Sequence, residues 1–203
     1  SEVKAKAIID QSIQTKNEGR VEALNADFSL MNNVKQTASE IASLPAKIDI
    51  ILHAVGILLT RAEYTSEGIE KDLAVSYLSR FVLTEELHQK GLLKKSTIML
   101  NIAASSPKVP SFAQMEFNNL AEVEARTGMK SHGQAQLAND LYTALAAKKY
   151  GITTIGYGPG SVDTNIRREV PKIVRSLMKP IFYFFTRKPE EVAKQFVQIL
   201  SKE

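Results

Sequence analysis

The chain has 203 residues, 44% of them hydrophobic and 24% charged, a composition typical of a globular protein that folds as one domain over 1–203. The absence of cysteine excludes disulfides and thiolate metal sites, and three histidines far apart in the sequence do not predict a metal site of another kind. A net charge of +4 does not indicate a nucleic-acid partner, and because no apolar run approaches the roughly 20 residues of a membrane span, we expect a cytoplasmic protein.

Helical and strand patterns alternate along the chain. Apolar residues at helical spacing predict helices over 2–14, 32–43, 66–90 and 131–150, and short apolar runs predict strands over 20–27, 48–56, 97–102 and 152–157. The run over 48–56 is continuous and rich in β-branched residues, as in a strand that is buried on both faces. The alternation predicts an α/β fold, in which helices flank a parallel sheet with right-handed crossovers.

Short sequence motifs lie on or beside these predicted elements. They are Ala26-Asp27-Phe28-Ser29, His53-Ala54-Val55-Gly56, the helix segment 74–84, Leu137-Ala138-Asn139, Pro159-Gly160-Ser161-Val162-Asp163-Thr164 and Lys188-Pro189-Glu190-Glu191. In order and spacing the set resembles the short-chain dehydrogenase/reductase family, and most of all its retinol-dehydrogenase-like branch, over nearly the whole chain. The resemblance implies a Rossmann-like sheet and a homodimer formed through the helices over 66–90 and 131–150.

The resemblance also implies residues for both ends of a dinucleotide cofactor. Asp27 falls where the branch has an aspartate that contacts adenine, and Gly56 ends a strand beside the cofactor cleft. Pro159, Gly160 and Thr164 fall in the loop that contacts nicotinamide in the family.

The phosphates of a dinucleotide are held by a glycine-rich turn between the first strand and the first helix of a Rossmann fold. The ten glycines of this chain form no such turn, and Ser1 falls where the family's second strand has just ended. Relative to the family, about 30 residues, one β-α-β unit, are therefore expected to be missing. We expect the adenine and nicotinamide contacts to be vestigial and no cofactor to bind, unless a missing N-terminal segment provides an NAD(P) site.

The catalytic set of the family is replaced at every position. His132 and Gln136 stand where the family has Tyr and Lys, Ser76 stands where it has a helix Asn, and its Ser falls on Ala104, with Ser105 one residue later. In the family the lysine ammonium lowers the pKa of the tyrosine phenol, and an imidazole beside a neutral amide cannot reproduce that pair.

His132 is the residue best suited to proton transfer, since an unperturbed imidazole has a pKa near 6.5. Gln136 would orient a carbonyl group by hydrogen bonding, and Ser76 or Ser105 would supply a hydroxyl. The structural alternatives are a polar residue at the start of a helix for His132, a surface side chain for Gln136, and the start of a loop for Ser105.

A basic amphipathic helix followed by an aromatic run occupies 166–187, which is the lid over the substrate in the family. We therefore expect an apolar ligand pocket beneath it. The expected lining residues are His53, Ala104, Tyr157, Ile166, Val170 and Phe182. The alternatives for this helix are peripheral contact with an anionic membrane and plain packing against the domain. The alternative for His53 is a hydrogen-bonded place in the core.

These observations favour a non-redox protein of the superfamily that binds or acts on an apolar small molecule, as a cofactor-independent isomerase or cyclase would. An alternative is an NAD(P)-dependent oxidoreductase whose cofactor-binding half is absent from this chain. A second alternative is a catalytically dead scaffold subunit.

Overall fold

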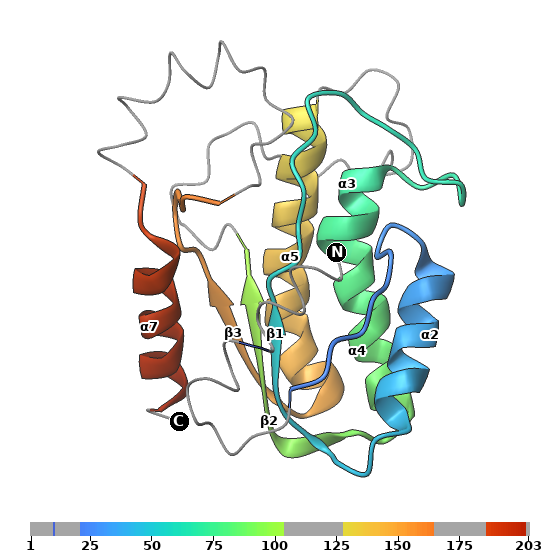
Figure 1. Ribbon diagram of the computed structural model, residues 1–203, viewed down its shortest axis with the longest axis vertical. Helices are drawn as coiled ribbons and strands as arrows, with labels where there is room; N and C mark the ends of the chain where they lie inside the picture. The colour runs from blue at the N-terminus through green and yellow to red at the C-terminus, as the bar shows by residue number, and fades with distance from the viewer. Residues whose placement is uncertain (1–9, 11–20, 104–127, 165–185, 202–203) are drawn as a thin grey trace.

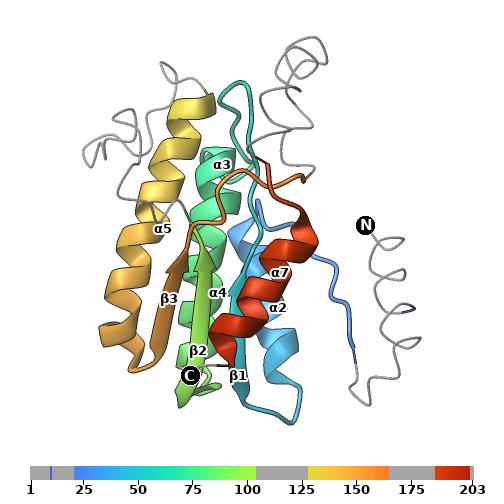
Figure 2. The same ribbon diagram turned by 90° about the vertical axis from the view of Figure 1, so that its left-hand side faces the viewer.

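A computed structural model describes residue 10 and residues 21–103, 128–164 and 186–201, and the structural statements below refer to these residues. Three parallel strands, β1 (Ile48–His53), β2 (Leu93–Ile102) and β3 (Thr153–Tyr157), form a sheet in the order β1-β2-β3. Helices α2 (Met31–Ala42), α4 (Ser79–Gln89) and α5 (Gly128–Tyr150) cover one face, and α7 (Pro189–Leu200) lies on the other (Figures 1 and 2). The predicted Rossmann-like α/β fold is confirmed.

The register of the sheet brings the carboxyl ends of the three strands together. His53 of β1 lies beside Asn101 of β2, and Asn101 lies beside Gly156 of β3. Because parallel strands all point the same way, the segments that follow them leave the sheet at one edge, where ligands of open α/β sheets bind. The functional site is therefore expected beyond these strand ends.

The main hydrophobic core lies between the sheet and the helices of its covered face. Its buried side chains come from α2, β1, α4, β2 and α5 and include Val34, Ile51, Leu87, Met99 and Ala146. Transfer of such side chains from water contributes about 1.5–3 kcal/mol each, which fixes α4 and α5 against β2.

The prediction that β1 is buried on both faces is wrong. Ile51 and His53 are buried, whereas Ile50 and Leu52, which point to the opposite face, are 48% and 49% exposed. The described element on that face, α7, packs its Phe196 against the ring of Tyr157 in β3, at the far side of the sheet from β1. Among the described residues, the second face of β1 is therefore only about half-buried.

The strand predicted over 20–27 is also wrong for the residues the structure describes, since 21–27 carry no regular secondary structure. A strand is stabilised by hydrogen bonds to a neighbouring strand, and β1, the outer strand of the described sheet, pairs only with β2. The apolar pattern of this segment is present without the neighbour that would make it a strand.

The long helix predicted over 66–90 begins later than expected. It consists of α3 (Lys71–Leu73), a π-helical segment η1 (Ala74–Leu78) and α4, which continue into one another. Glu70 caps its start, because its side chain accepts a hydrogen bond of 2.7 Å from the backbone N–H of Leu73.

The predicted helices over 32–43 and 131–150 are confirmed as α2 and α5, and the Pro-Glu-Glu motif opens α7 at Pro189. The predicted helix over 2–14, apart from residue 10, and the lid up to residue 185 lie outside the described residues. No helix within the described ranges is long and apolar enough to cross a membrane.

Candidate functional site

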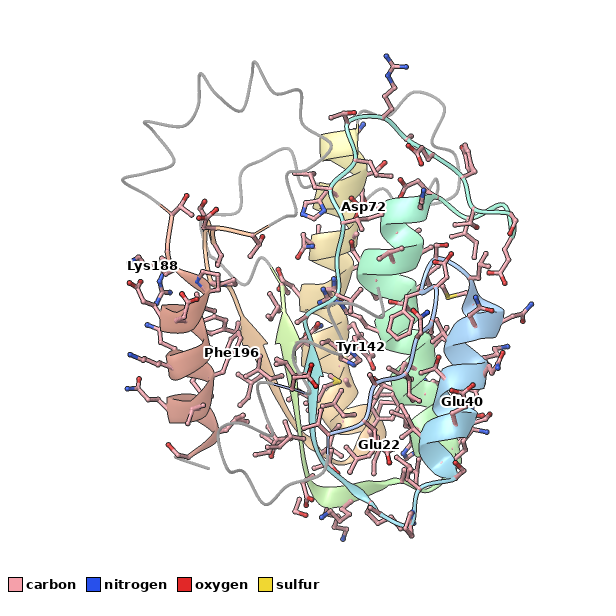
Figure 3. The ribbon with its side chains drawn as sticks, in the orientation of Figure 1. Glu22, Glu40, Asp72, Tyr142, Lys188 and Phe196 are labelled. Carbon is pink, nitrogen blue, oxygen red and sulfur yellow. The ribbon has the colours of Figure 1, made fainter. Side chains whose placement is uncertain are left out.

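The structure joins His132 to a carboxylate that the sequence did not reveal as its partner. His132 lies in the second turn of α5 and Asp72 in α3, and Figure 3 shows Asp72 where these two helices meet. Nδ1 of His132 is 3.2 Å from Oδ1 and 3.1 Å from Oδ2 of Asp72. The side chain of Asp72 is fully buried, while that of His132 remains 19% exposed.

A carboxylate that accepts a hydrogen bond at Nδ1 fixes the orientation of the imidazole ring and leaves the Nε2 lone pair on the opposite side of the ring. Sixty residues separate Asp72 from His132, so no local spacing in the sequence links them. The one available signal was the position of Asp72, one helical turn before Ser76 in the predicted helix.

The first residue of α5 is held close to the loop that follows β1. A Cβ atom at Gly128 would lie 1.8 Å from the backbone oxygen of Leu59, so only glycine permits this approach. The contact holds Gly128 of α5 against Leu59, one turn before His132.

Arg80 of α4 is buried beside this pair and connects the ends of two strands. Its Nη2 donates a hydrogen bond of 2.6 Å to the carbonyl of Val55, and its Nη1 donates to the side chain of Asn101 and to the carbonyl of Ile102. Burial lowers the pKa of Arg80 to about 10, although the charge of Asp72 acts in the opposite direction. The guanidinium is therefore charged at neutral pH and provides a positive charge in the interior near a buried carboxylate.

Ser76 is fully buried and bonded to backbone groups. Its hydroxyl oxygen accepts a hydrogen bond of 3.1 Å from the N–H of Ile57, and its carbonyl accepts one of 2.7 Å from the Asn139 side chain. Asn101 in turn donates to Thr143 of α5 at 2.8 Å. These bonds connect the loop after β1 to η1 and α5. Ser76 is therefore one of the residues that hold these segments together.

His53 is a hydrogen-bonded core residue, which was the alternative to its expected place in the ligand pocket. Its Nε2 lies 2.9 Å from the hydroxyl of Thr84, and that hydroxyl donates to the carbonyl of Arg80. Burial lowers the pKa of His53 to about 3, and the charge of Arg80 adds to this effect. The ring is therefore neutral at physiological pH.

A cavity of about 840 Å³ opens beside the carboxyl end of β1. Segment 22–29, α2, the loop after β1 and the helix that begins at α3 form its walls, and Asp27, Val55, Ile57, Leu59, Lys71 and Val75 are among its lining residues. Asp27 accepts a hydrogen bond of 2.9 Å from the N–H of Ser29, and hydrogen bonding to Ser29 holds the pKa of Asp27 below its usual value. The cavity thus has both apolar and charged walls, and its charged lining residues are Glu22, Asp27, Glu63 and Lys71.

The remaining predicted site residues lie in different places. Tyr157, at the end of β3, accepts a hydrogen bond of 3.3 Å from Arg187 and donates to Gln195 of α7, and Figure 3 shows Phe196 on the side of α7 that faces β3. Neither Tyr157 nor His53 lines the cavity. Gln136 is partly buried one turn after His132.

Gly56 lies in the loop after β1, between the cavity residues Val55 and Ile57. Gly160 has a φ of +71°, a conformation that favours glycine, in the Pro159–Thr164 loop after β3. The predicted residues Ala104, Ser105, Ile166, Val170 and Phe182 lie outside the described residues. Of the predicted site residues that the structure describes, Asp27 alone lines this cavity, and Gly56 lies between two residues that do.

A parallel sheet with a cavity at its strand ends defines a Rossmann-like protein. No family model matches the sequence. Human retinol dehydrogenase 14 is 26% identical to it over 180 residues, which cover 86% of this chain and 53% of that protein. Human polyprenol dehydrogenase is 22% identical over 199 residues, covering 94% of this chain and 59% of that protein. The resemblance to the short-chain dehydrogenase/reductase family is confirmed by these sequence relatives.

The solved structures that resemble this chain carry the same fold. A doubly substituted short-chain dehydrogenase/reductase from Serratia marcescens superimposes with a TM-score of 0.71 at 21% identity, covering 98% of this chain and 76% of that one. A blue fluorescent protein from a metagenomic library, in complex with NADPH, gives a TM-score of 0.67 at 18% identity, covering 94% of this chain and 72% of that one. The chain spans about half the length of the curated relatives it matches.

The expectation that no cofactor is used is wrong. The curated relatives include named dehydrogenases, and one protein of the same fold is described in complex with NADPH, which points to NAD(P) use. The expectation rested on the lack of a glycine-rich turn, and that turn concerns only the phosphates of a dinucleotide.

Proposed function

We propose that this protein takes part in the NAD(P)-linked oxidation or reduction of an apolar alcohol or carbonyl compound. The observation that carries the proposal is the cavity of about 840 Å³ beside the carboxyl end of β1. Ligands of open α/β sheets bind in the crevice outside the carboxyl ends of the strands, and this volume lies in the range of small-molecule sites.

The residues present fit the two ends of a dinucleotide. Asp27, ionised and on the cavity wall, would receive the adenine end, as the family resemblance implies. Pro159 and Thr164 flank the loop that would meet the nicotinamide end, and Gly160 gives that loop its left-handed turn. The sequence offers no glycine-rich turn for the phosphates between them. When bound, NAD(P) would supply or accept the hydride, and this chain would position the substrate and manage its proton.

The names of two relatives support the substrate class. Retinol and polyprenols are both isoprenoid alcohols, and the relatives named for them match 86% and 94% of this chain. An isoprenoid alcohol presents one hydroxyl on a long apolar chain, the kind of molecule that a mostly apolar small-molecule site accepts. We therefore propose an isoprenoid or similarly apolar alcohol, or the matching aldehyde, as substrate.

A non-redox reaction on the same class of molecule is the second candidate. It is supported by the replacement of the family's Tyr and Lys by His132 and Gln136, because proton transfer alone is enough for isomerisation or cyclisation. In this alternative NAD(P) would be bound without a net change in the oxidation state of the substrate.

Product mass separates the two candidates. The protein is incubated with retinol or a short polyprenol and NAD+ or NADP+, and with the aldehydes and NADH or NADPH, and the products are analysed by mass spectrometry. The redox proposal predicts a product that differs from its substrate by two hydrogen atoms. An isomer of unchanged mass would move the non-redox reaction to first place, and no product from any pairing would contradict both.

A further inference from the structure

We infer that His132 and Asp72 form an acid–base pair in which Nε2 of His132 exchanges a proton with the substrate oxygen and Asp72 positions the ring. The inference rests on the proposed function for the reaction that the pair serves. Nothing in the family pattern assigns Asp72, because the family's catalytic set uses the positions of Ser76, Ala104, His132 and Gln136.

The geometry of the pair is that of an oriented base. Both oxygens of Asp72 lie within 3.2 Å of Nδ1 of His132, so the carboxylate accepts the hydrogen at Nδ1 and Nε2 is left as the acceptor. The aspartate is fully buried while the histidine keeps 19% of its side chain exposed. The ring thus has one nitrogen fixed in the interior while part of it remains accessible.

A buried carboxylate is costly unless its charge is compensated. Three features compensate Asp72: the Nδ1–H of His132, the charged guanidinium of Arg80, and a place in the first turn of a helix, where the helix dipole favours negative charge. If His132 were only a polar residue at the start of α5, none of these three features would be required. These three features offset the cost of burying the Asp72 side chain.

The pair and the cavity share one helix. Lys71, the residue before Asp72, lines the cavity, as does Val75 one turn later. Ile57, on another part of the same wall, donates its N–H to Ser76. Asp72 therefore belongs to a helix that forms part of the cavity wall, and the carboxylate of Asp72 joins this helix to His132 of α5.

The exchange of tyrosine for histidine also explains the lost lysine. A phenol has an ordinary pKa near 10 and needs a neighbouring cation to act near neutral pH, whereas an imidazole has one near 6.5 and does not. Gln136 in the lysine position is then consistent with an active site, since no ammonium is required.

The proposed step balances in both directions. In oxidation the hydroxyl proton passes to the lone pair of Nε2, and bound NAD(P)+ would accept the hydride from the alcohol carbon, which would leave a carbonyl compound and a protonated His132. In reduction, protonated His132 returns that proton to the carbonyl oxygen as the carbon receives the hydride.

Turnover of three variants tests the pair. H132Q removes the base, D72N keeps the shape of the positioning residue but removes its charge, and H88Q makes the same change as H132Q at an exposed histidine at the far end of α4. We expect H132Q to lower kcat by about 10²–10⁴-fold and D72N by about 10²-fold or more, with NADPH affinity unchanged and H88Q equal to wild type. A kcat of H132Q within about threefold of wild type would overturn the inference.

The ring nitrogens give a second measurement that needs neither turnover nor a folded D72N variant. In ¹⁵N spectra of the wild-type protein, with H132Q used to assign the signals, we expect the neutral ring of His132 to carry its hydrogen on Nδ1. A hydrogen on Nε2 instead would exclude the pair. Absence of NAD(P)-linked turnover in the wild type, with the Nδ1–H signal present, would count against the proposed function and leave the pair supported.

Discussion

His53 and His132 show how neighbours assign different roles to the same side chain. His53 is 6% exposed, is bonded to Thr84 and has a pKa near 3 because burial disfavours its charged form. His132 is partly exposed and faces a fully buried carboxylate instead of a hydroxyl. A neutral hydrogen-bonded histidine fits the core, and an oriented, accessible one is suited to proton transfer.

The buried histidine predicts a pH dependence of stability. The pKa of His53 is about 3 in the folded state and about 6.5 when unfolded, so between these values the unfolded chain binds more protons. The free energy of unfolding should therefore rise with pH in this window and fall as pH drops, by about 1.4 kcal/mol per unit. Urea denaturation of wild type and His53→Asn at pH 5, 6 and 7 measures this.

Below about pH 4.5 the carboxylates Glu85 and Asp27, whose pKa values are lowered, add to the loss of stability. The comparison is therefore made above that pH. His53→Asn should remove most of the slope between pH 5 and 6.5, and an equal slope in both proteins would contradict the role of His53.

At the scale of elements, β1 has two unlike faces. Ile51 is 8% exposed and belongs to the main core, whereas Leu52 is 49% exposed on the other face. A parallel strand normally has both faces covered, and an exposed apolar edge strand favours association with other chains. The exposed face of β1 is thus the surface on which this chain is expected to associate non-specifically.

A pair of lysine substitutions tests this account of β1. Leu52→Lys should leave thermal stability nearly unchanged and raise the concentration at which the protein aggregates, because the side chain already faces solvent. Ile51→Lys should destabilise the protein by several kcal/mol, because it buries an unpaired charge. Equal losses in melting temperature for the two variants would show that both faces of β1 are covered in solution.

The predictability of these elements followed from how local their signals are. The helix at 131–150 and the strand at 152–157 were predictable because their apolar spacing is local. The conformation of segment 21–27 was not predictable in this way, because a strand also needs a neighbouring strand to pair with, and the apolar pattern does not show whether one is present. The pairing of Asp72 with His132 depends on the packing of α3 against α5, and no spacing within either helix encodes it.

At the scale of the whole molecule, the outer face of α5 carries exposed apolar side chains. Leu145 is 67% exposed and Leu141 is 42% exposed on this helix. The homodimer that the family resemblance implies stays a prediction, and water-exposed leucines on this helix would gain stability if a second subunit covered them.

Light scattering with size-exclusion chromatography tests that dimer. Leu145→Asp should convert the protein to a monomer, because it places a charge in the centre of the proposed interface. Val197→Asp is the matched control, since Val197 of α7 has the same 67% exposure and lies on the opposite face of the sheet. A wild-type monomer, or a dimer that survives Leu145→Asp, would place the interface elsewhere or exclude it.

The account as a whole depends on whether the cavity beside β1 receives NAD(P). Calorimetric titration of NADPH and NADH into the wild-type protein, Val55→Trp and Val197→Trp measures this most directly, since Val55 lines the cavity and Val197 does not. We predict saturable binding of at least one nucleotide to the wild type and to Val197→Trp, and its loss in Val55→Trp. Absence of heat with both nucleotides in the wild type, or binding unaffected by Val55→Trp, would contradict the proposed site.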